Sequence, residues 1–158
     1  MYQKSYVEIP YELQAVKIDT IAERDGQQLR NFLIDTLTVS GNSIPKKYRL
    51  TITLNETKSQ IGFRKDLTPR HTKIIMIASF NLIDIHNGKT LLTDKVRAVA
   101  SYSLGAQSSF GALSAETSEK SARSNALKAI SNDLKIRVAA FLAAHNKPLK
   151  IAERPNED

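Results

Sequence analysis

The C-terminal part of this chain carries one long helical pattern, which constrains the fold more than any other feature. Large apolar residues recur there at the spacing of a single helix face: Leu127, Ile130, Leu134, Val138 and Phe141. Ala115, Ala122 and Ala126 extend this face with small side chains. The pattern predicts a helix over residues 112–144, roughly 50 Å long at about 1.5 Å per residue. A helix of that length with one apolar stripe is expected to lie across a whole sheet.

Two segments before this helix alternate with the period of a strand that has one buried face. In "KYRLTITLNET" the apolar positions are Tyr48, Leu50, Ile52 and Leu54. In "LLTDKVRAVASYS" the inward positions are Val96, Ala98, Ala100 and Tyr102, and the outward ones are Lys95, Arg97, Val99 and Ser101. Between them, residues 73–85 are apolar on both faces, as in a central strand, and Asn87-Gly88 predicts a two-residue hairpin turn.

The first half of the chain predicts a shorter strand and a second helix. Residues 14–21 alternate over a few positions and indicate a strand. Asp25 and Gln28 have the spacing of a capping box, and Gly41 is a typical helix end. The apolar stripe between them consists of Leu29, Phe32, Leu33 and Leu37.

The predicted order is therefore β-α-β-β-β-α, which indicates an α+β fold. We expect a two-layer sandwich with both helices on one face of a mostly antiparallel four-stranded sheet. Residues 14–144 form the single predicted domain. Residues 1–13 are predicted to be an extended arm, and residues 145–158 a flexible polar tail.

Composition and charge narrow the classes of function. The 158 residues include no cysteine, which excludes disulfides, thiolate metal sites and a cysteine nucleophile. The net charge is +7, and the predicted tail is charge-balanced, so the excess lies in the folded body. A basic body indicates an anionic partner such as nucleic acid, a phosphorylated lipid or an acidic protein surface.

The stretch "SYSLGAQSSFGALSAE" (residues 101–116) is the one segment that could hold a catalytic loop. It contains no G-x-S-x-G pattern, and no phosphate-binding glycine motif occurs in the chain. The histidines at 71, 86 and 145 are not placed as natural triad members. Glu119 is followed by Arg123 at helical spacing, which predicts a surface ion pair rather than an acid/base couple. We therefore expect a strand-to-helix connection, no catalytic residue, no cofactor, no metal site and no enzyme activity.

Basic residues concentrate where the predicted strands meet their loops. The candidate anion-binding residues are Arg64, Lys65, Arg70, Lys73, Lys95 and Arg97. If the strands pair in sequence order, part of this set could form one basic edge. Only Phe63 is interleaved with these charges for base stacking, so nucleic acid is not the expected ligand.

The whole ordered part of the chain also resembles a known family. The segments that carry the resemblance are "IAERDGQQLRNFLIDTL", "YRLTITL", "FNLIDIHNGKTLLTDKVRAVASYSL" and "ALSAETSEKSARSNALKAISNDLKIRVAAFLA". Over about residues 14–144 the chain is similar to the LptE family of lipopolysaccharide-assembly lipoproteins. The matching positions are Arg24, Leu29, Arg30, Asn31, Tyr48, Leu50, Asp84, Gly88, Ser101, Tyr102, Ala115, Glu116, Ile130 and Leu134.

This resemblance implies a non-enzymatic protein on the periplasmic side of the Gram-negative outer membrane. Such a protein is expected to act as plug and assembly partner of the LptD β-barrel and to contact lipopolysaccharide. The family is held to the membrane by an acylated N-terminal cysteine, so we expect a signal and lipobox cysteine that this chain does not contain. The alternatives are an accessory periplasmic lipoprotein of a phospholipid-transport system and a basic nucleic-acid-binding module.

Overall fold

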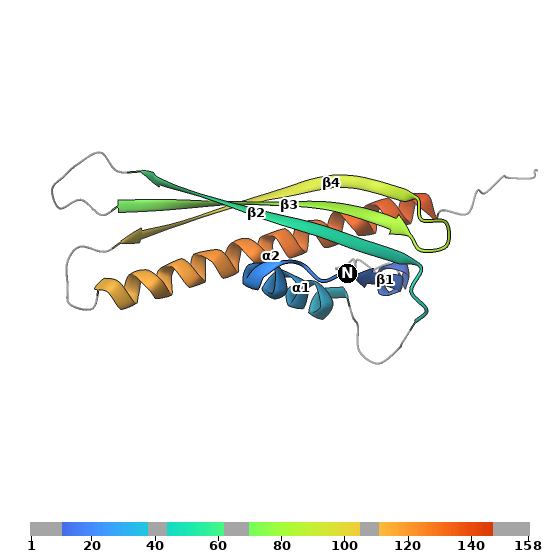
Figure 1. Ribbon diagram of the computed structural model, residues 1–158, viewed down its shortest axis with the longest axis horizontal. Coiled ribbons are helices and arrows are strands. Elements are labelled where there is room, and N and C mark those ends of the chain that lie inside the picture. Colours follow the sequence, from blue (N-terminus) through green and yellow to red (C-terminus); the bar gives the residue numbers. More distant parts are fainter. Residues whose placement is uncertain (1–10, 38–43, 62–69, 105–110, 147–158) are drawn as a thin grey trace, which may run out of the picture.

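The computed structural model describes residues 11–37, 44–61, 70–104 and 111–146, which form two layers (Figure 1). The first layer is a sheet of β1 (Val16–Ile18), β2 (Tyr48–Ile61), β3 (Arg70–Asp84) and β4 (Thr90–Leu104). The second consists of α1 (Glu23–Leu37) and the long α2 (Gly111–His145), and the short 3-10 helix η1 (Tyr11–Ala15) precedes β1. The predicted α+β class and the order β-α-β-β-β-α are confirmed.

The strands lie in the order β1-β2-β3-β4, and only β1 is parallel to its neighbour. β1 pairs with β2 over three positions, from Val16 opposite Tyr48 to Ile18 opposite Leu50. It is thus much shorter than the predicted strand over residues 14–21, because residues 11–15 turn into η1 instead. β2, β3 and β4 form two long antiparallel ladders.

The connection between β3 and β4 is longer than the predicted two-residue turn. Gly88 has the expected positive φ of 69°, but β3 ends at Asp84 and β4 begins at Thr90. The Asp84 carboxylate accepts a hydrogen bond from the backbone N–H of His86, and the Asn87 side chain accepts one from the N–H of Lys89. These two local bonds stabilise the five-residue loop.

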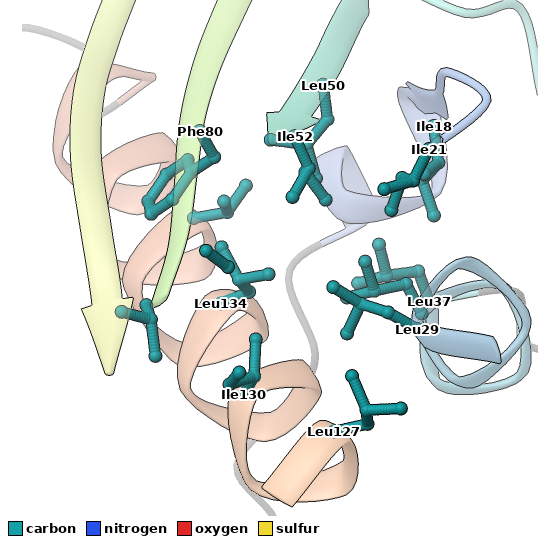
Figure 2. Packing of buried hydrophobic residues seen from close by; sticks show 14 of the residues in the cluster. Ile18, Ile21, Leu29, Leu37, Leu50, Ile52, Phe80, Leu127, Ile130 and Leu134 are labelled. Carbon is teal, nitrogen blue, oxygen red and sulfur yellow. The ribbon is translucent and has the colours of Figure 1, made fainter. Parts of the chain in front are cut away.

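The core lies between the helices and one face of the sheet (Figure 2). Alternate strand residues point into it, so that Leu50, Ile74, Met76, Phe80 and Leu82 are almost fully buried. The α2 stripe contributes Leu127, Ile130, Leu134, Val138 and Leu142. Each of these large side chains contributes on the order of 1.5–3 kcal/mol when it is fully buried. Phe141, predicted to end the stripe, is only partly buried, and its ring stacks on that of His145. Leu142 ends the stripe instead, because residues 138 and 142 lie one helical turn apart on the same face.

The start of α1 differs from the capping-box prediction and contains a close contact that the sequence did not predict. The helix begins at Glu23, so Asp25 lies inside its first turn and does not cap it. Gly26 is buried against the preceding segment, where a Cβ atom would lie 2.6 Å from Cγ2 of Ile21. The glycine therefore permits a close approach of the β1–α1 connection to the helix.

The predicted ends of the domain need correction where the structure describes them. Residues 11–13 do not belong to an extended arm, since they lie in η1 and Leu13 is fully buried. His145 belongs to α2 rather than to the tail, and the Asn146 side-chain amide donates a hydrogen bond to the Tyr48 hydroxyl. The rest of the predicted arm and tail, residues 1–10 and 147–158, lies outside the described residues. Among the described helices, none is long and apolar enough to cross a membrane.

Candidate functional site

Both helices cover the same face of the sheet, and none of the described elements covers the opposite face (Figure 1). We call this second surface the outer face and define it by the side chains that alternate with the buried ones on β2, β3 and β4. They are Arg49, Thr51, Thr53, Asn55, Thr57, Ser59, His71, Lys73, Ile75, Ile77, Ser79, Asn81, Ile83, Thr93, Lys95, Arg97, Val99, Ser101 and Ser103. Hydroxyl, amide and cationic groups therefore make up most of this face.

The outer face holds three of the six predicted anion-binding residues. Lys95 and Arg97 are exposed neighbours on β4, opposite Ser79 and Ile77 of β3. Lys73 is on the same face but opposite Ser101, four residues beyond Arg97 and so roughly 13 Å away along the strand. Among the described residues, none of the three has an ion-pair partner. The structure thus brings Lys95 and Arg97 together and leaves Lys73 apart from them.

The other three predicted residues are described only in part or not at all. Arg70 begins β3 opposite Leu104, and its side chain lies outside what the structure describes. Arg64 and Lys65 fall between the described parts of β2 and β3. The proposed basic edge therefore stays a prediction for these three positions.

An apolar strip runs across the middle of the outer face. Ile75 lies opposite Thr57 on one side and Val99 on the other, and Ile77 follows it on the same strand. Val99 is 44% exposed, whereas the two isoleucines are half-buried by their neighbours. Arg97 lies opposite Ile77, so a cation borders the strip directly. The outer face is thus amphipathic at its centre.

On the opposite side of the sheet, ion pairs around Arg123 join β2 to both helices. The Arg123 Nη2 atom lies 2.8 Å from the Glu56 carboxylate of β2 and 2.9 Å from that of Glu119 on α2. Its Nε atom lies 3.6 Å from the carboxylate of Asp25 on α1. Lys58 of β2 also pairs with Glu119. This network fixes α1, α2 and β2 relative to one another.

The pKa shifts in this network differ in sign because the carboxylates differ in their surroundings. The hydrogen bond from Lys58 and the nearby cations lower the pKa of Glu119. Burial raises the pKa of Asp25, and Glu56 raises it further, against the opposing effect of Arg123. The hydrogen bond to Glu56 raises the pKa of Arg123, which stays charged. The network thus stabilises the charge on Glu119 and opposes the charge on Asp25.

The sequence predicted only one part of this network. The Glu119–Arg123 ion pair is confirmed, because the spacing of four residues on one helix places the two side chains together. Asp25, Glu56 and Lys58 were missed as partners, since they come from other elements and no local pattern marks them. The Arg123 network is a set of structural ion pairs that join β2, α1 and α2.

The serine-rich stretch joins β4 to α2, as predicted, although residues 105–110 lie outside the described part of the chain. Ser103 lies opposite His71 in the sheet, and both are exposed, with no hydrogen bond between their side chains. Among the described residues, no group of three or more His, Asp or Glu side chains could hold a metal ion. No constellation with the geometry of a nucleophile and its base occurs in this part of the stretch.

The fold is one that several bacterial proteins share. A protein of Caulobacter crescentus CB15, described as a lipoprotein, superposes with a TM-score of 0.66 at 17% identity, over 85% of this chain and 96% of its own. The minor lipoprotein of Acinetobacter baumannii gives 0.54 at 12% identity, over 79% and 91%. Lipoprotein B of Nitrosomonas europaea gives 0.53 at 15% identity, over 82% and 86%. By sequence, the chain matches neither a protein-family model nor a curated protein.

These likenesses establish the architecture of the whole described domain. The chain spans nearly the full length of each of the three proteins, so the shared unit is the complete two-layer sandwich and not a fragment of it. At 12 to 17% identity, side chains are free to differ while the layers stay the same. The outer face and the Arg123 network therefore have to be interpreted from this chain's own residues.

Proposed function

We propose that this protein is a non-enzymatic, lipid-anchored component of the bacterial outer membrane that acts in lipopolysaccharide assembly. In this role it is a plug and assembly partner of an LptD-type β-barrel, and it contacts lipopolysaccharide through Lys95 and Arg97. The observation that carries the proposal is the likeness of the complete domain to three bacterial proteins described as lipoproteins. The resemblance of the sequence to the LptE family supplies the specific partner.

The outer face supports this role by its polarity. The interior of a large outer-membrane barrel is polar and water-filled, so a plug needs a broad hydrophilic surface. Here the threonine, serine and asparagine side chains of β2 and β3 provide such a surface over two long strands. Thr93 already donates a 2.8 Å hydrogen bond to Asn81 across the sheet, and the remaining hydroxyl groups can pair with a barrel wall in the same way.

The pair of cations on β4 supports contact with a phosphorylated glycolipid. A guanidinium group can bind phosphate with two hydrogen bonds, and the neighbouring ammonium group adds a second charge. Lys95 and Arg97 are exposed and lie two residues apart on one strand face, roughly 7 Å along the chain. A headgroup with two phosphate groups can contact both side chains across that distance.

The apolar strip beside Arg97 favours one alternative, an accessory lipoprotein of a phospholipid-transport system. Ile75, Ile77 and Val99 could cover part of an acyl chain while Arg97 holds the phosphate. A nucleic-acid-binding module has no such support, because the described outer face carries no phenylalanine, tyrosine or tryptophan for base stacking. The two lipoprotein functions differ in their protein partner.

The deciding experiment is co-purification from the native envelope. The full-length gene product, tagged at its C-terminus, would be extracted in mild detergent and its partners identified. A large β-barrel in near-equimolar amount supports the proposal, whereas recovery with an inner-membrane transporter and no barrel supports the alternative. Recovery with neither partner would contradict both.

A charge-reversal experiment then tests the lipid contact. The double variant Lys95→Glu/Arg97→Glu should lose most of its affinity for lipopolysaccharide, because two attractive charges become repulsive. Lys89→Glu/Lys135→Glu changes the net charge equally, on the β3–β4 loop and on α2, and should retain it. Equal loss in both variants would mean that net charge and not the outer face governs binding.

A further inference from the structure

A groove of about 820 Å³ lies between α1 and α2, on the layer opposite the outer face. Every side chain that lines it is polar or charged. The lining includes four cations and one carboxylate: Arg24, Lys120, Arg123, Lys128 and Asp25. The other lining side chains are amides and hydroxyls from both helices. The groove is therefore lined by hydrophilic side chains and carries an excess of positive charge.

Most of this excess does not belong to the ion-pair network. Arg123 is held by Asp25, Glu56 and Glu119 and is neutralised by them. Arg24 and Lys128 are exposed, on α1 and α2 respectively. Among the described residues, the only charged or aromatic contact of Lys128 is with the Phe32 ring, whose centroid lies 5.7 Å from the Lys128 Nζ atom. These two cations are available to an anion from opposite walls of the groove.

A second hollow, of about 400 Å³, adjoins the groove on the other side of the α2 surface. The two share Ser121 and Asn125, so they meet along one exposed line of the helix. The second hollow is lined mainly by hydroxyl groups, among them Tyr102 and Ser103 of β4 and Ser118 of α2. Cations thus line one half of this combined surface and hydroxyls the other.

We propose that this combined surface is a binding site for a phosphorylated, hydroxyl-rich ligand such as a sugar phosphate or a phosphorylated polyol headgroup. Arg24 and Lys128 bind the phosphate, while Ser121, Asn125 and the hydroxyls of the second hollow exchange hydrogen bonds with the ligand's hydroxyl groups. Serine and asparagine side chains both donate and accept, which suits groups that also do both.

The chemistry of the lining excludes the other common ligand classes. Pockets for cofactors and apolar ligands are lined mainly by hydrophobic side chains, and this one has none in the groove. A nucleobase would need an aromatic platform, and no aromatic residue lines the groove. Tyr102 lines the second hollow, but it is partly buried and packs against the core. A protein partner would need buried aromatic or aliphatic anchors at its centre. A small, hydrophilic anion is the class that remains.

This site is independent of the function proposed above. The groove with Arg24 and Lys128 lies between the two helices, while Lys95 and Arg97 lie on the outer face. The second hollow reaches the edge of the sheet at Ser101 and Ser103 but contains neither of these two cations. The two sites can therefore be tested on the same protein with variants that do not overlap.

The test is an NMR titration of the full chain with glucose 6-phosphate, inorganic phosphate and glucose. We expect glucose 6-phosphate to bind most tightly and to shift the amide signals of Ser121, Asn125 and Lys128. Arg24→Gln/Lys128→Gln should weaken its binding about tenfold, or roughly threefold per exposed cation. Lys47→Gln/Lys89→Gln removes the same charge before β2 and from the β3–β4 loop, away from both proposed sites, and should leave the affinity unchanged. Both variants alter exposed side chains, so both should fold, as circular dichroism would verify.

Three results would overturn the proposal. The first is equal affinity for glucose 6-phosphate and glucose, and the second is an equal effect of the two double variants. The third is tighter binding of a hexaglutamate peptide than of glucose 6-phosphate, which would make the groove a docking site for an acidic protein segment.

A vesicle experiment identifies the source of the ligand. Phosphatidylcholine vesicles that contain phosphatidylinositol phosphate would be sedimented with the protein. Co-sedimentation of the wild type but not of Arg24→Gln/Lys128→Gln supports the proposal with a lipid headgroup as ligand. Binding of free glucose 6-phosphate alone supports it with a soluble sugar phosphate.

Discussion

Replacing Arg123 by glutamine tests whether its ion pairs hold the helix layer to the sheet. The variant removes contacts of 2.8, 2.9 and 3.6 Å to three carboxylates, whose side chains are 22 to 30% exposed. Water screens pairs of this exposure, so each contributes about 0.5–1 kcal/mol. Three pairs together give roughly 2 kcal/mol. We therefore expect the free energy of unfolding to fall by about 2 kcal/mol at pH 7.

The pH dependence of this loss gives the sharper test. The pKa of Glu119 lies below its ordinary value, so its contribution is present above the unfolded pKa and is lost as pH falls through the folded pKa. The pKa of Asp25 is raised, so its carboxyl group favours folding below the unfolded pKa and ceases to do so as pH rises through the folded pKa. Without Arg123, the pKa of Asp25 should rise further, because the cation that lowers it is gone. The cost of Arg123→Gln should therefore shrink between pH 7 and about pH 5.

Urea unfolding followed by circular dichroism at both pH values measures this difference. Arg137→Gln is the matched control, because it removes a single ion pair with Asp94, between exposed side chains of α2 and β4. The control should change stability little, with no greater cost at pH 7 than at pH 5. The interpretation is that Arg123 offsets the repulsion between the carboxylates of Asp25, Glu56 and Glu119. A cost of Arg123→Gln that stays constant or grows as the pH falls would refute it, because protonation would then not relieve any repulsion.

Three other predictions concern single positions and are measured by the same unfolding assay. Gly26→Ala should cost about 1–3 kcal/mol of unfolding free energy, because the new Cβ atom would overlap Ile21. This is the net cost after the gain of about 1 kcal/mol that alanine brings in helix propensity. The control Asp35→Ala, at an exposed position of the same helix, should stabilise the protein. Asp25→Asn should not destabilise at pH 7, since burial already opposes its charge. Ser131→Ala should stabilise by about 0.5–1 kcal/mol, because its buried hydroxyl has no hydrogen-bond partner in the part of the chain that the structure describes. Destabilisation by Asp25→Asn or by Ser131→Ala would contradict the reasoning.

The strand faces could be predicted from the sequence because alternation depends only on the local backbone. Val96 and Ala98 are buried and Lys95 and Arg97 are exposed, as the period of two requires. The helix stripe was predicted for the same reason, although its last turn uses Leu142 in place of Phe141. The end of a stripe is set by where the sheet stops covering it, and the sequence does not contain that information.

The polar surfaces could be predicted only in part, because they depend on contacts between distant elements. Arg123 and Glu56 are 67 residues apart, and no spacing rule links them. The groove exists only because α1 packs beside α2, so Arg24 and Lys128 carry no shared signal along the chain. The predicted basic set also shows the limit of counting charges, since strand register separates Lys73 from Lys95 and Arg97.

The residues that stabilise the fold and those proposed to bind lipopolysaccharide lie on different surfaces, because the large apolar side chains point to the inner face of the sheet. All the large buried residues lie between the helices and the inner face, so the outer face contributes little to the core. Substitutions at Lys95 and Arg97 should therefore change binding without changing stability, whereas substitutions in the Arg123 network should change stability first. The groove combines both cases, because Arg24 and Lys128 are exposed, while Arg123 in the same lining pairs with carboxylates of β2 and of both helices. A ligand that binds there would also stabilise the packing of α1 on α2, so glucose 6-phosphate should raise the midpoint of unfolding of the wild type more than that of Arg24→Gln/Lys128→Gln.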